Sequence, residues 1–139
     1  MTTIQYLDSL ESIQEDSFAE GFFDGWPNRP SPETFVRMLH GSAYVVLAQD
    51  SDTGKIVGFV NALSDGVLSA YIPLLEVVPS HQGQGIGREL ARRLLKKLDA
   101  YYMVDLMCDP ELESFYARQG MRPANGMTLR NYKNQKGIS

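Results

Sequence analysis

The sequence is poor in cysteine and contains no long apolar run. Its single cysteine, Cys108, excludes an internal disulfide and fits a reducing compartment. Nothing approaches the ~20 apolar residues that a membrane helix needs. The first ten residues, MTTIQYLDSL, have neither a basic n-region nor an apolar h-region, so we expect no signal peptide. Together these absences predict a cytoplasmic protein without a membrane partner.

The chain also lacks an excess of positive charge. It has 13 Lys and Arg against 17 Asp and Glu, a net charge of −4, and an estimated pI near 5.1. The basic cluster between Arg88 and Lys97 falls on one face of a predicted helix. Nucleic acid is therefore a poor partner, and a DNA-binding regulator is disfavoured. The length of 139 residues predicts one domain, residues 1–139, large enough for a real core.

No signature of a metal site or of a covalent nucleophile is present. The two histidines, His40 and His81, are isolated in the sequence, and Cys108 lacks a local motif. We expect neither a metal ion nor a covalent intermediate.

The most informative stretch runs from Leu74 to Leu98. An apolar run ends at Pro79, three glycines follow within five residues (Gly83, Gly85 and Gly87), and a long amphipathic pattern begins at Arg88. A strand, a small-residue turn and a helix in direct succession leave unpaired N–H groups at the positive end of the helix dipole. Such a turn suits a phosphate or pyrophosphate group.

Two familiar phosphate loops do not match this turn. A Walker loop requires Gly-x-x-x-x-Gly-Lys-Ser/Thr, whereas Gly87 is followed by Arg88 and Glu89. A dinucleotide fingerprint requires Gly-x-Gly-x-x-Gly and usually opens its fold, but more than half of this chain precedes the turn. Asp105 lies at a plausible distance along the chain for a ribose-binding carboxylate. This match does not outweigh the different glycine spacing and the late position of the turn.

The pattern that does match is Gln82-x-x-Gly85-x-Gly87 after a Val-x-Pro strand end. It resembles the acyl-CoA pyrophosphate loop of the GNAT family of N-acetyltransferases. Downstream, the heptapeptide from Phe115 to Met121 is similar to the family's Phe-Tyr-x-x-x-Gly-Phe. The resemblance runs from about residue 43 to 121. It implies an enzyme that moves acetyl from acetyl-CoA, a co-substrate, to a primary amine by direct attack.

The expected fold is α/β, with a GNAT-like mixed, mostly antiparallel sheet, helices on both faces and a splayed parallel strand pair. The patterns predict strands at 3–7, 43–49, 55–63, 68–78, 102–107 and 127–132, and helices at 8–21, 31–40, 88–98 and 110–119. Asp8 and Ser31 are the expected caps of the first two helices. Pro73 cannot donate within a ladder, so we expect an irregularity there.

The resemblance implies site residues that lie in this turn and beside it. Backbone groups of the turn would bind the pyrophosphate, Val77 the pantetheine arm, and an amide near Leu75 the acetyl carbonyl. These cofactor-binding candidates are Leu75, Val77, Gln82, Gly83, Gln84, Gly85, Ile86 and Gly87. Where the family often has a pantetheine-binding Asn, this chain has Asp109, which cannot donate when ionised. Met121 replaces the usual aromatic residue after Gly120.

Two side chains are the candidate catalytic groups. By resemblance, Tyr116 protonates the departing thiolate of CoA; the alternative is an aromatic core residue on an amphipathic helix. Glu76 is the candidate base, because a carboxylate within an apolar run should have a raised pKa. An outward-facing Glu76 fits the pattern equally well, and a water chain or Tyr71 could replace it as the base.

The acceptor and the assembly stay open. A small amine, an antibiotic, an amino acid or a protein N-terminus would each suit the chemistry, and a homodimer stays open. The aromatic loop 21–30 is the expected wall of the acceptor site, although core packing accounts equally well for Phe22. A non-catalytic acyl-CoA-binding sensor or partner module is the alternative function.

Overall fold

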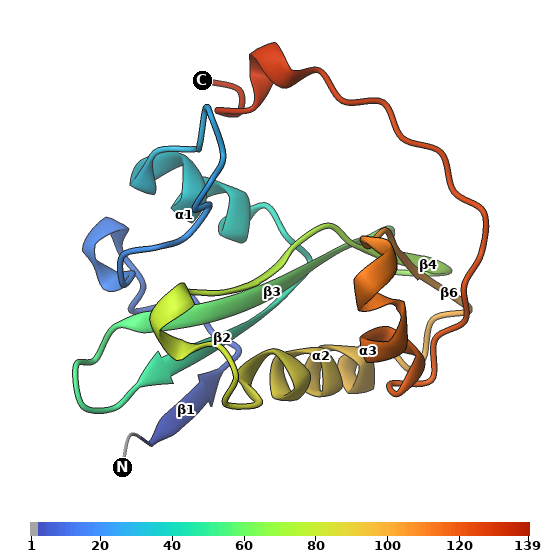
Figure 1. Ribbon diagram of the computed structural model, residues 1–139, viewed down its shortest axis with the longest axis horizontal. Helices are drawn as coiled ribbons and strands as arrows, with labels where there is room; N and C mark the ends of the chain where they lie inside the picture. The colour runs from blue at the N-terminus through green and yellow to red at the C-terminus, as the bar shows by residue number, and fades with distance from the viewer. Residues whose placement is uncertain (1–2) are drawn as a thin grey trace.

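A single twisted sheet organises the molecule, and the computed structural model describes residues 3–139 of it (Figure 1). Its strand order is β1-β2-β3-β4-β6, and β5 pairs with β3 outside this path. Every pair is antiparallel except β4 with β6. The strands are β1 Ile4–Leu7, β2 Tyr44–Asp50, β3 Ile56–Ser64, β4 Ser69–Ile72, β5 Leu75–Val77 and β6 Met103–Leu106. The predicted mixed sheet is confirmed, including its parallel pair.

Three α-helices accompany the sheet: α1 Pro32–His40, α2 Ile86–Lys97 and α3 Glu113–Ala117. The Ser31 side chain caps α1 by accepting the Thr34 N–H at 3.1 Å, as its sequence predicted. Helix α3 is shorter than expected, because a 3-10 turn occupies Pro110–Leu112 ahead of it. Figure 1 shows α1 on one side of the sheet and α2 on the other.

The core has one layer on each face of β3, because successive strand residues point to opposite faces. On one face, Phe59 packs with Phe35 of α1 at a ring-centroid distance of 5.0 Å. On the other face, Gly58 allows α2 to approach closely. A Cβ at Gly58 would lie 3.1 Å from Leu90 Cδ1 and 3.2 Å from the Glu76 carbonyl oxygen. The missing side chain of Gly58 therefore sets how near α2 sits to the sheet.

The irregularity expected at Pro73 divides the fourth predicted strand. Residues before it form β4, which pairs with β3 and with β6. Residues after it form β5, which within the described chain pairs with β3 alone. Strands β4 and β5 therefore part at Pro73, and within the described chain one edge of β5 stays unpaired.

Two predicted elements are wrong. The helix expected from Asp8 to Gly21 is instead an irregular segment with one 3-10 turn, Glu15–Ser17. Asp8 forms an ion pair with Lys97 at 2.7 Å and caps nothing, and the Ala19 N–H donates to the Ile56 carbonyl oxygen of β3 at 2.9 Å. Pairing with the sheet thus outweighs local helix signals. The strand expected at 127–132 has no partner within the described chain.

Candidate functional site

The glycine-rich turn connects β5 to α2 through a 3-10 turn, Pro79–His81. Gly83 and Gly85 both have left-handed backbones, with φ of 77° and 83°, and a Cβ at either position would meet nothing within 4 Å. Gly85 is the N-cap of α2 and supplies no side chain to the first N–H groups of the helix. Within residues 3–139 no side chain caps these N–H groups, which lie at the positive end of the helix dipole.

Two further residues hold the turn in place against β5. A Cβ at Gly87 would lie 3.6 Å from Leu75 Cδ2 and 3.8 Å from Val77 Cγ2, so the first turn of α2 packs directly on β5. The Gln82 side chain reaches back, and its Nε2 donates to the Val77 carbonyl oxygen at 2.9 Å. The start of the turn is thus tied to the strand.

The free edge of β5 presents alternate backbone groups. The Leu74 carbonyl oxygen accepts from the Asn61 N–H, and the Val78 N–H donates to the Val57 carbonyl oxygen, so both groups point toward β3. Because alternate residues of an antiparallel strand point to opposite sides, the groups of Leu75 and Val77 point away from β3. The N–H groups of Leu75 and Val77 are therefore aimed out of the sheet, beside the glycine-rich turn.

Tyr116 lies on α3, close to the start of α2. Gln119, just beyond α3, donates from Nε2 to the Arg88 carbonyl oxygen at 3.4 Å and so links the two helices. The Tyr116 side chain is half-buried, and its hydroxyl makes no hydrogen bond within residues 3–139. Burial, and then the neighbouring Cys108, raise the pKa of the Tyr116 hydroxyl, which therefore stays protonated at neutral pH.

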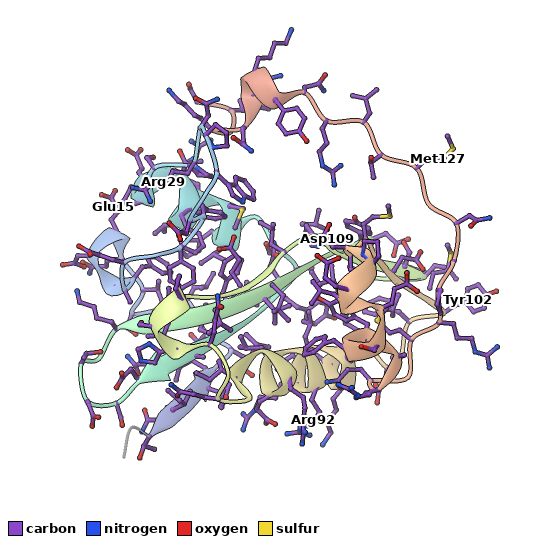
Figure 2. The ribbon with its side chains drawn as sticks, in the orientation of Figure 1. Glu15, Arg29, Arg92, Tyr102, Asp109 and Met127 are labelled. Carbon is purple, nitrogen blue, oxygen red and sulfur yellow. The ribbon has the colours of Figure 1, made fainter. Side chains whose placement is uncertain are left out.

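Asp109 precedes the 3-10 turn that leads into α3, and it is exposed (Figure 2). Its carboxylate caps none of the N–H groups of this turn. The side chain is thus free to meet a ligand, but only as an acceptor when it is ionised.

Glu76 lies on β5 and is half-buried. Its Oε1 accepts the N–H of Phe23 at 2.9 Å, which joins the aromatic loop to the strand beside the turn. Burial raises the pKa of the Glu76 carboxyl, and the Phe23 N–H offsets part of this effect. The carboxylate therefore takes up a proton more readily than an exposed one, as a general base must.

The aromatic loop contributes mainly to the core. Phe22 and Phe23 are buried, with 7% and 2% of their surface exposed, so core packing is the correct interpretation for both. Phe23 also has a left-handed backbone, with φ of 59°, and the bond to Glu76 holds it there. Trp26 is half-buried at 4.9 Å from the Phe23 ring, so only Trp26 keeps an accessible face.

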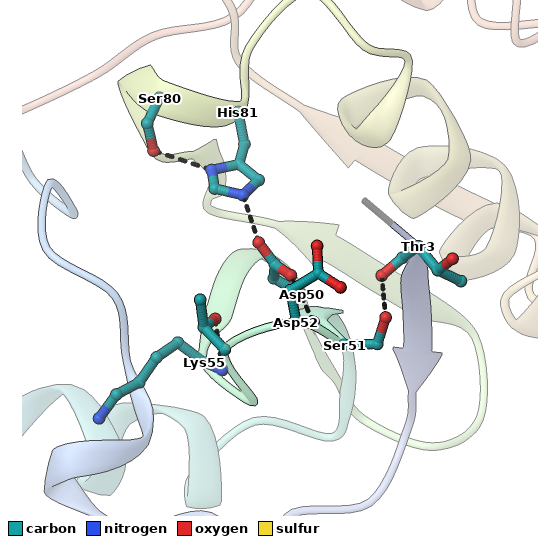
Figure 3. A network of polar contacts seen from close by, with 8 residues as sticks. Thr3, Asp50, Ser51, Asp52, Lys55, Ser80 and His81 are labelled. Atoms are coloured by element: carbon teal, nitrogen blue, oxygen red, sulfur yellow. Dashed lines mark hydrogen bonds and ion pairs between the residues drawn. The ribbon is translucent and has the colours of Figure 1, made fainter. Parts of the chain in front are cut away.

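Sequence reasoning missed a polar chain at the start of the turn (Figure 3). His81 Nε2 lies 2.9 Å from Asp50 Oδ2, and His81 Nδ1 lies 2.8 Å from the Ser80 hydroxyl. The His81 contact, and then the Asp52 N–H, lower the pKa of the buried Asp50 carboxyl. This chain of contacts fixes the end of the β2–β3 hairpin to the residue that precedes Gln82.

Two features are absent from residues 3–139: a cluster of metal ligands and a membrane-spanning helix. No group of three or more His, Cys, Asp or Glu side chains is arranged to hold a metal ion. In the same part of the chain, no helix is both long and apolar enough to cross a bilayer.

Comparison with known proteins agrees with this geometry. Residues 7–121 match the acetyltransferase (GNAT) family. The uncharacterized N-acetyltransferase ycf52 of Porphyra purpurea is 31% identical over 99 residues, which cover 69% of this chain and 57% of that relative. This chain therefore spans little more than half the length of that relative.

Two solved structures share the fold. A candidate acetyltransferase from Deinococcus radiodurans R1 has a TM-score of 0.92 and 49% identity, over 100% of this chain and 99% of that one. Aminoglycoside N-acetyltransferase AAC(6')-Iy, in complex with CoA, has a TM-score of 0.67 and 11% identity, over 94% and 95% of the two chains, a likeness of fold alone. Family match and fold lead to one conclusion: this chain is a member of the GNAT family of acetyltransferases.

Proposed function

We propose that the protein transfers an acetyl group from acetyl-CoA to a primary amine, by direct attack of the amine on the thioester. The observation that carries this proposal is the turn from Gln82 to Gly87 at the start of α2. It offers unpaired N–H groups, the positive end of a helix dipole and two positions, Gly83 and Gly85, where no side chain obstructs a ligand. A pyrophosphate group fits these features.

The free edge of β5 would bind the rest of the donor. Val77, whose carbonyl oxygen already accepts from Gln82, has its N–H left to donate to an amide of the pantetheine arm. The Leu75 N–H, two residues nearer to Pro73, would donate to the acetyl carbonyl oxygen as it gains charge. Backbone donors of this kind need no reorganisation during the reaction, which is why they stabilise developing charge well.

Two side chains would move protons. Glu76, with its raised pKa, would take a proton from the attacking ammonium, directly or through water, so that the neutral amine can attack the carbonyl carbon. As the C–N bond forms, the C–S bond breaks and the thiolate leaves. Tyr116, which is protonated at neutral pH, would give its hydroxyl proton to that sulfur. The acetylated nitrogen would then lose its extra proton, and the Tyr116 phenolate would regain one through water, which leaves a neutral amide and free CoA thiol.

The acceptor would enter beside the aromatic loop. Trp26 offers the accessible ring there, and aromatic faces attract ammonium groups by roughly 0.5–2 kcal/mol. The exposed carboxylate of Asp24 adds negative charge to the same loop. An amine with a cationic or apolar body suits such a wall, and the choice among such amines requires a substrate screen.

Calorimetric titration with acetyl-CoA tests the donor site. Gly85→Glu places a carboxylate where we expect phosphate, and should reduce affinity below detection. Gly66→Glu is the matched control, because Gly66 has φ of +77° and equally open surroundings, but lies in the β3–β4 turn. Both variants carry the same charge and a similar backbone strain of ~1–2 kcal/mol. If folded Gly85→Glu binds acetyl-CoA with unchanged affinity, the donor does not bind at this turn.

Turnover tests the chemistry separately. Free CoA thiol should appear when the protein and acetyl-CoA meet a panel of primary amines, and each acetylated product should be visible by mass spectrometry. Binding of acetyl-CoA without amine-dependent release of thiol, across small amines and peptide N-termini, would instead identify a binding module. The proposed binding site and the proposed reaction can thus be refuted independently of each other.

A further inference from the structure

The sheet face that carries Phe59 is covered by α1 in one part and exposed in another. Phe35 of α1 packs on Phe59, so α1 covers the part of β3 around Phe59. Near the end of β3, Leu63 is 46% exposed, whereas its neighbour Ala62 on the other face is buried. Exposed side chains continue from Leu63 across β4 and β6. We call this surface the open face, and its residues are Leu63, Tyr71, Met103 and Asp105.

The strand register places the open face beside the candidate base. Leu63 pairs with Tyr71, and Tyr71 pairs with Asp105, so these three side chains form one row across β3, β4 and β6. Glu76 pairs with Phe59. The connection from Tyr71 to Glu76 is one residue longer than the matching part of β3, as in a β-bulge, so both side chains face the same way. Glu76 and Asp105 therefore share one face of the sheet.

These two carboxylates carry all the charge of the four strands. Strands β3 to β6 contain no lysine or arginine, and Glu76 and Asp105 are their acidic residues. Asp105 is exposed and forms no ion pair within residues 3–139. The rows of Phe59 and Leu63 lie roughly 13 Å apart along β3, and β6 adds one strand spacing of about 5 Å. The Cα atoms of Glu76 and Asp105 are therefore on the order of 14 Å apart.

A polar atom without a donor lies between these carboxylates. Asn61 is two residues from both Phe59 and Leu63, so it faces the same side, and it is 1% exposed. Its Nδ2 donates to Ser42 Oγ at 3.0 Å, and that hydroxyl donates to the Met38 carbonyl oxygen at 3.0 Å, which fixes the orientation of the amide. Asn61 Oδ1 then has no hydrogen-bond partner within residues 3–139.

The buried oxygen of Asn61 calls for an N–H group. A buried acceptor without a donor costs stability, and a ligand that donates to it recovers that cost. Half-buried Leu74 lies opposite Asn61 on this face, since the Asn61 N–H donates to the Leu74 carbonyl oxygen at 3.3 Å. A rotation of the Leu74 side chain would give a ligand access to Asn61 Oδ1. The face thus offers two carboxylates with an acceptor for N–H between them.

We propose that the amine acceptor is a linear polyamine that lies along the open face, an inference that rests on the acetyl transfer proposed above. In this arrangement one primary amine lies at Glu76 and receives the acetyl group. An internal amine donates to Asn61 Oδ1, and the ammonium at the far end pairs with Asp105. The methylene groups between them pack on Tyr71 and Leu63. A polycation also suits a chain with a net charge of −4.

Steady-state kinetics with three matched amines measures these contacts. Spermidine has an internal amine, diaminooctane replaces that amine with a methylene group, and nonylamine also replaces the far ammonium with a methyl group. Wild-type kcat/KM should fall in this order at low ionic strength. Loss of the far ammonium should lower it by about threefold to fivefold, the size expected for an exposed ion pair. Added salt should reduce this difference.

The variant Asp105→Asn isolates the far contact. It should lower kcat/KM for diaminooctane to the level of nonylamine and leave nonylamine unchanged. The advantage of spermidine over diaminooctane should persist, because Asn61 makes a separate contact. Asp99→Asn is the matched control, since Asp99 is also exposed but lies between α2 and β6, and it should change none of the three values.

The outcomes separate the polyamine from the acetyl transfer. If the three amines have equal kcat/KM, or if Asp105→Asn does not change the preference for diaminooctane over nonylamine, the polyamine is the wrong acceptor and the acetyl transfer stands. Equal values for spermidine and diaminooctane would exclude the contact with Asn61. If neither these amines nor any other primary amine releases CoA thiol, the acetyl transfer and the polyamine are both wrong.

Discussion

Substitutions at Glu76 can distinguish a structural role of its carboxylate from a catalytic one, because the carboxylate also contacts Phe23. Glu76 Oε1 accepts the Phe23 N–H at 2.9 Å, and Phe23 is 2% exposed with a left-handed backbone. Glu76→Ala removes the one acceptor that residues 3–139 offer to this amide. A buried donor left unpaired costs about 1–3 kcal/mol, so the free energy of unfolding should fall by that amount. Glu76→Gln keeps an oxygen in place, and we expect it to lie within ~1 kcal/mol of the wild type.

The pH dependence of stability follows from the raised pKa of Glu76. Because its folded-state pKa lies above the ordinary value of 4.5, the unfolded chain ionises first as pH rises. The wild type should therefore lose stability relative to Glu76→Gln as pH rises from below 4.5 through the raised pKa. Exposed Glu11 provides the control, since Glu11→Gln removes a surface carboxylate and should leave the free energy of unfolding at neutral pH nearly unchanged. Urea unfolding followed by circular dichroism measures all four proteins.

Kinetics completes the comparison. If Glu76 is the base, Glu76→Gln should keep its fold and its affinity for acetyl-CoA but lose ~10²–10⁴-fold in kcat, together with the acidic limb of the pH–rate profile. A Glu76→Gln variant with wild-type kcat and profile would show that the carboxylate only holds the loop. Wild-type stability in Glu76→Ala would refute the structural reasoning, since the Phe23 amide would then need no acceptor.

Other predictions follow from single contacts. Tyr116→Phe should leave stability and acetyl-CoA affinity nearly unchanged and lower kcat by ~10²–10⁴-fold in steady-state assays; an unchanged single-turnover rate would make Tyr116 a packing residue. Gly58→Ala should cost about 1–3 kcal/mol in urea unfolding, because its Cβ would lie 3.1 Å from Leu90 Cδ1; no loss would mean that α2 shifts freely. Asp50→Asn should lower the melting temperature at pH 7, and this deficit should shrink as pH falls below about 4, because the lowered pKa of Asp50 stabilises the fold only above that range. A deficit constant between pH 7 and 3 would exclude the contact with His81 as its source.

The elements that sequence predicted correctly are those with local causes. Ser31 followed by Pro32 marks the start of α1, and the apolar stripe of α2 covers the sheet as its period requires. The irregularity at Pro73 also follows from one residue. The helix predicted at 8–21 is absent because the segment pairs with β3 instead, where the Ala19 N–H donates to the Ile56 carbonyl oxygen. No local sequence pattern reveals such a distant partner.

For the candidate site, the backbone geometry of the turn was predictable from the sequence, whereas the contacts of the candidate side chains were not. Closely spaced glycines predict a turn whose backbone is not covered by side chains, so the location of the turn could be predicted. The partners of Glu76 and His81 were not, because Phe23 and Asp50 lie 53 and 31 residues away in the chain. The strand predicted at 127–132 is wrong for a different reason. The sequence has the alternation of a strand, but the described chain contains no strand that pairs with it.

The donor site that we propose consists mainly of main-chain groups, so it depends on packing more than on reactive side chains. The donors of the turn stay in place because Gly87 lets α2 rest on β5, and those of β5 stay free because Pro73 parts that strand from β4. His81 adds a tie to the β2–β3 hairpin at the start of the turn. A substitution at any of these contacts displaces several donors together. We therefore expect substitutions that displace the turn to reduce acetyl-CoA affinity, even where the substituted residue does not contact the ligand.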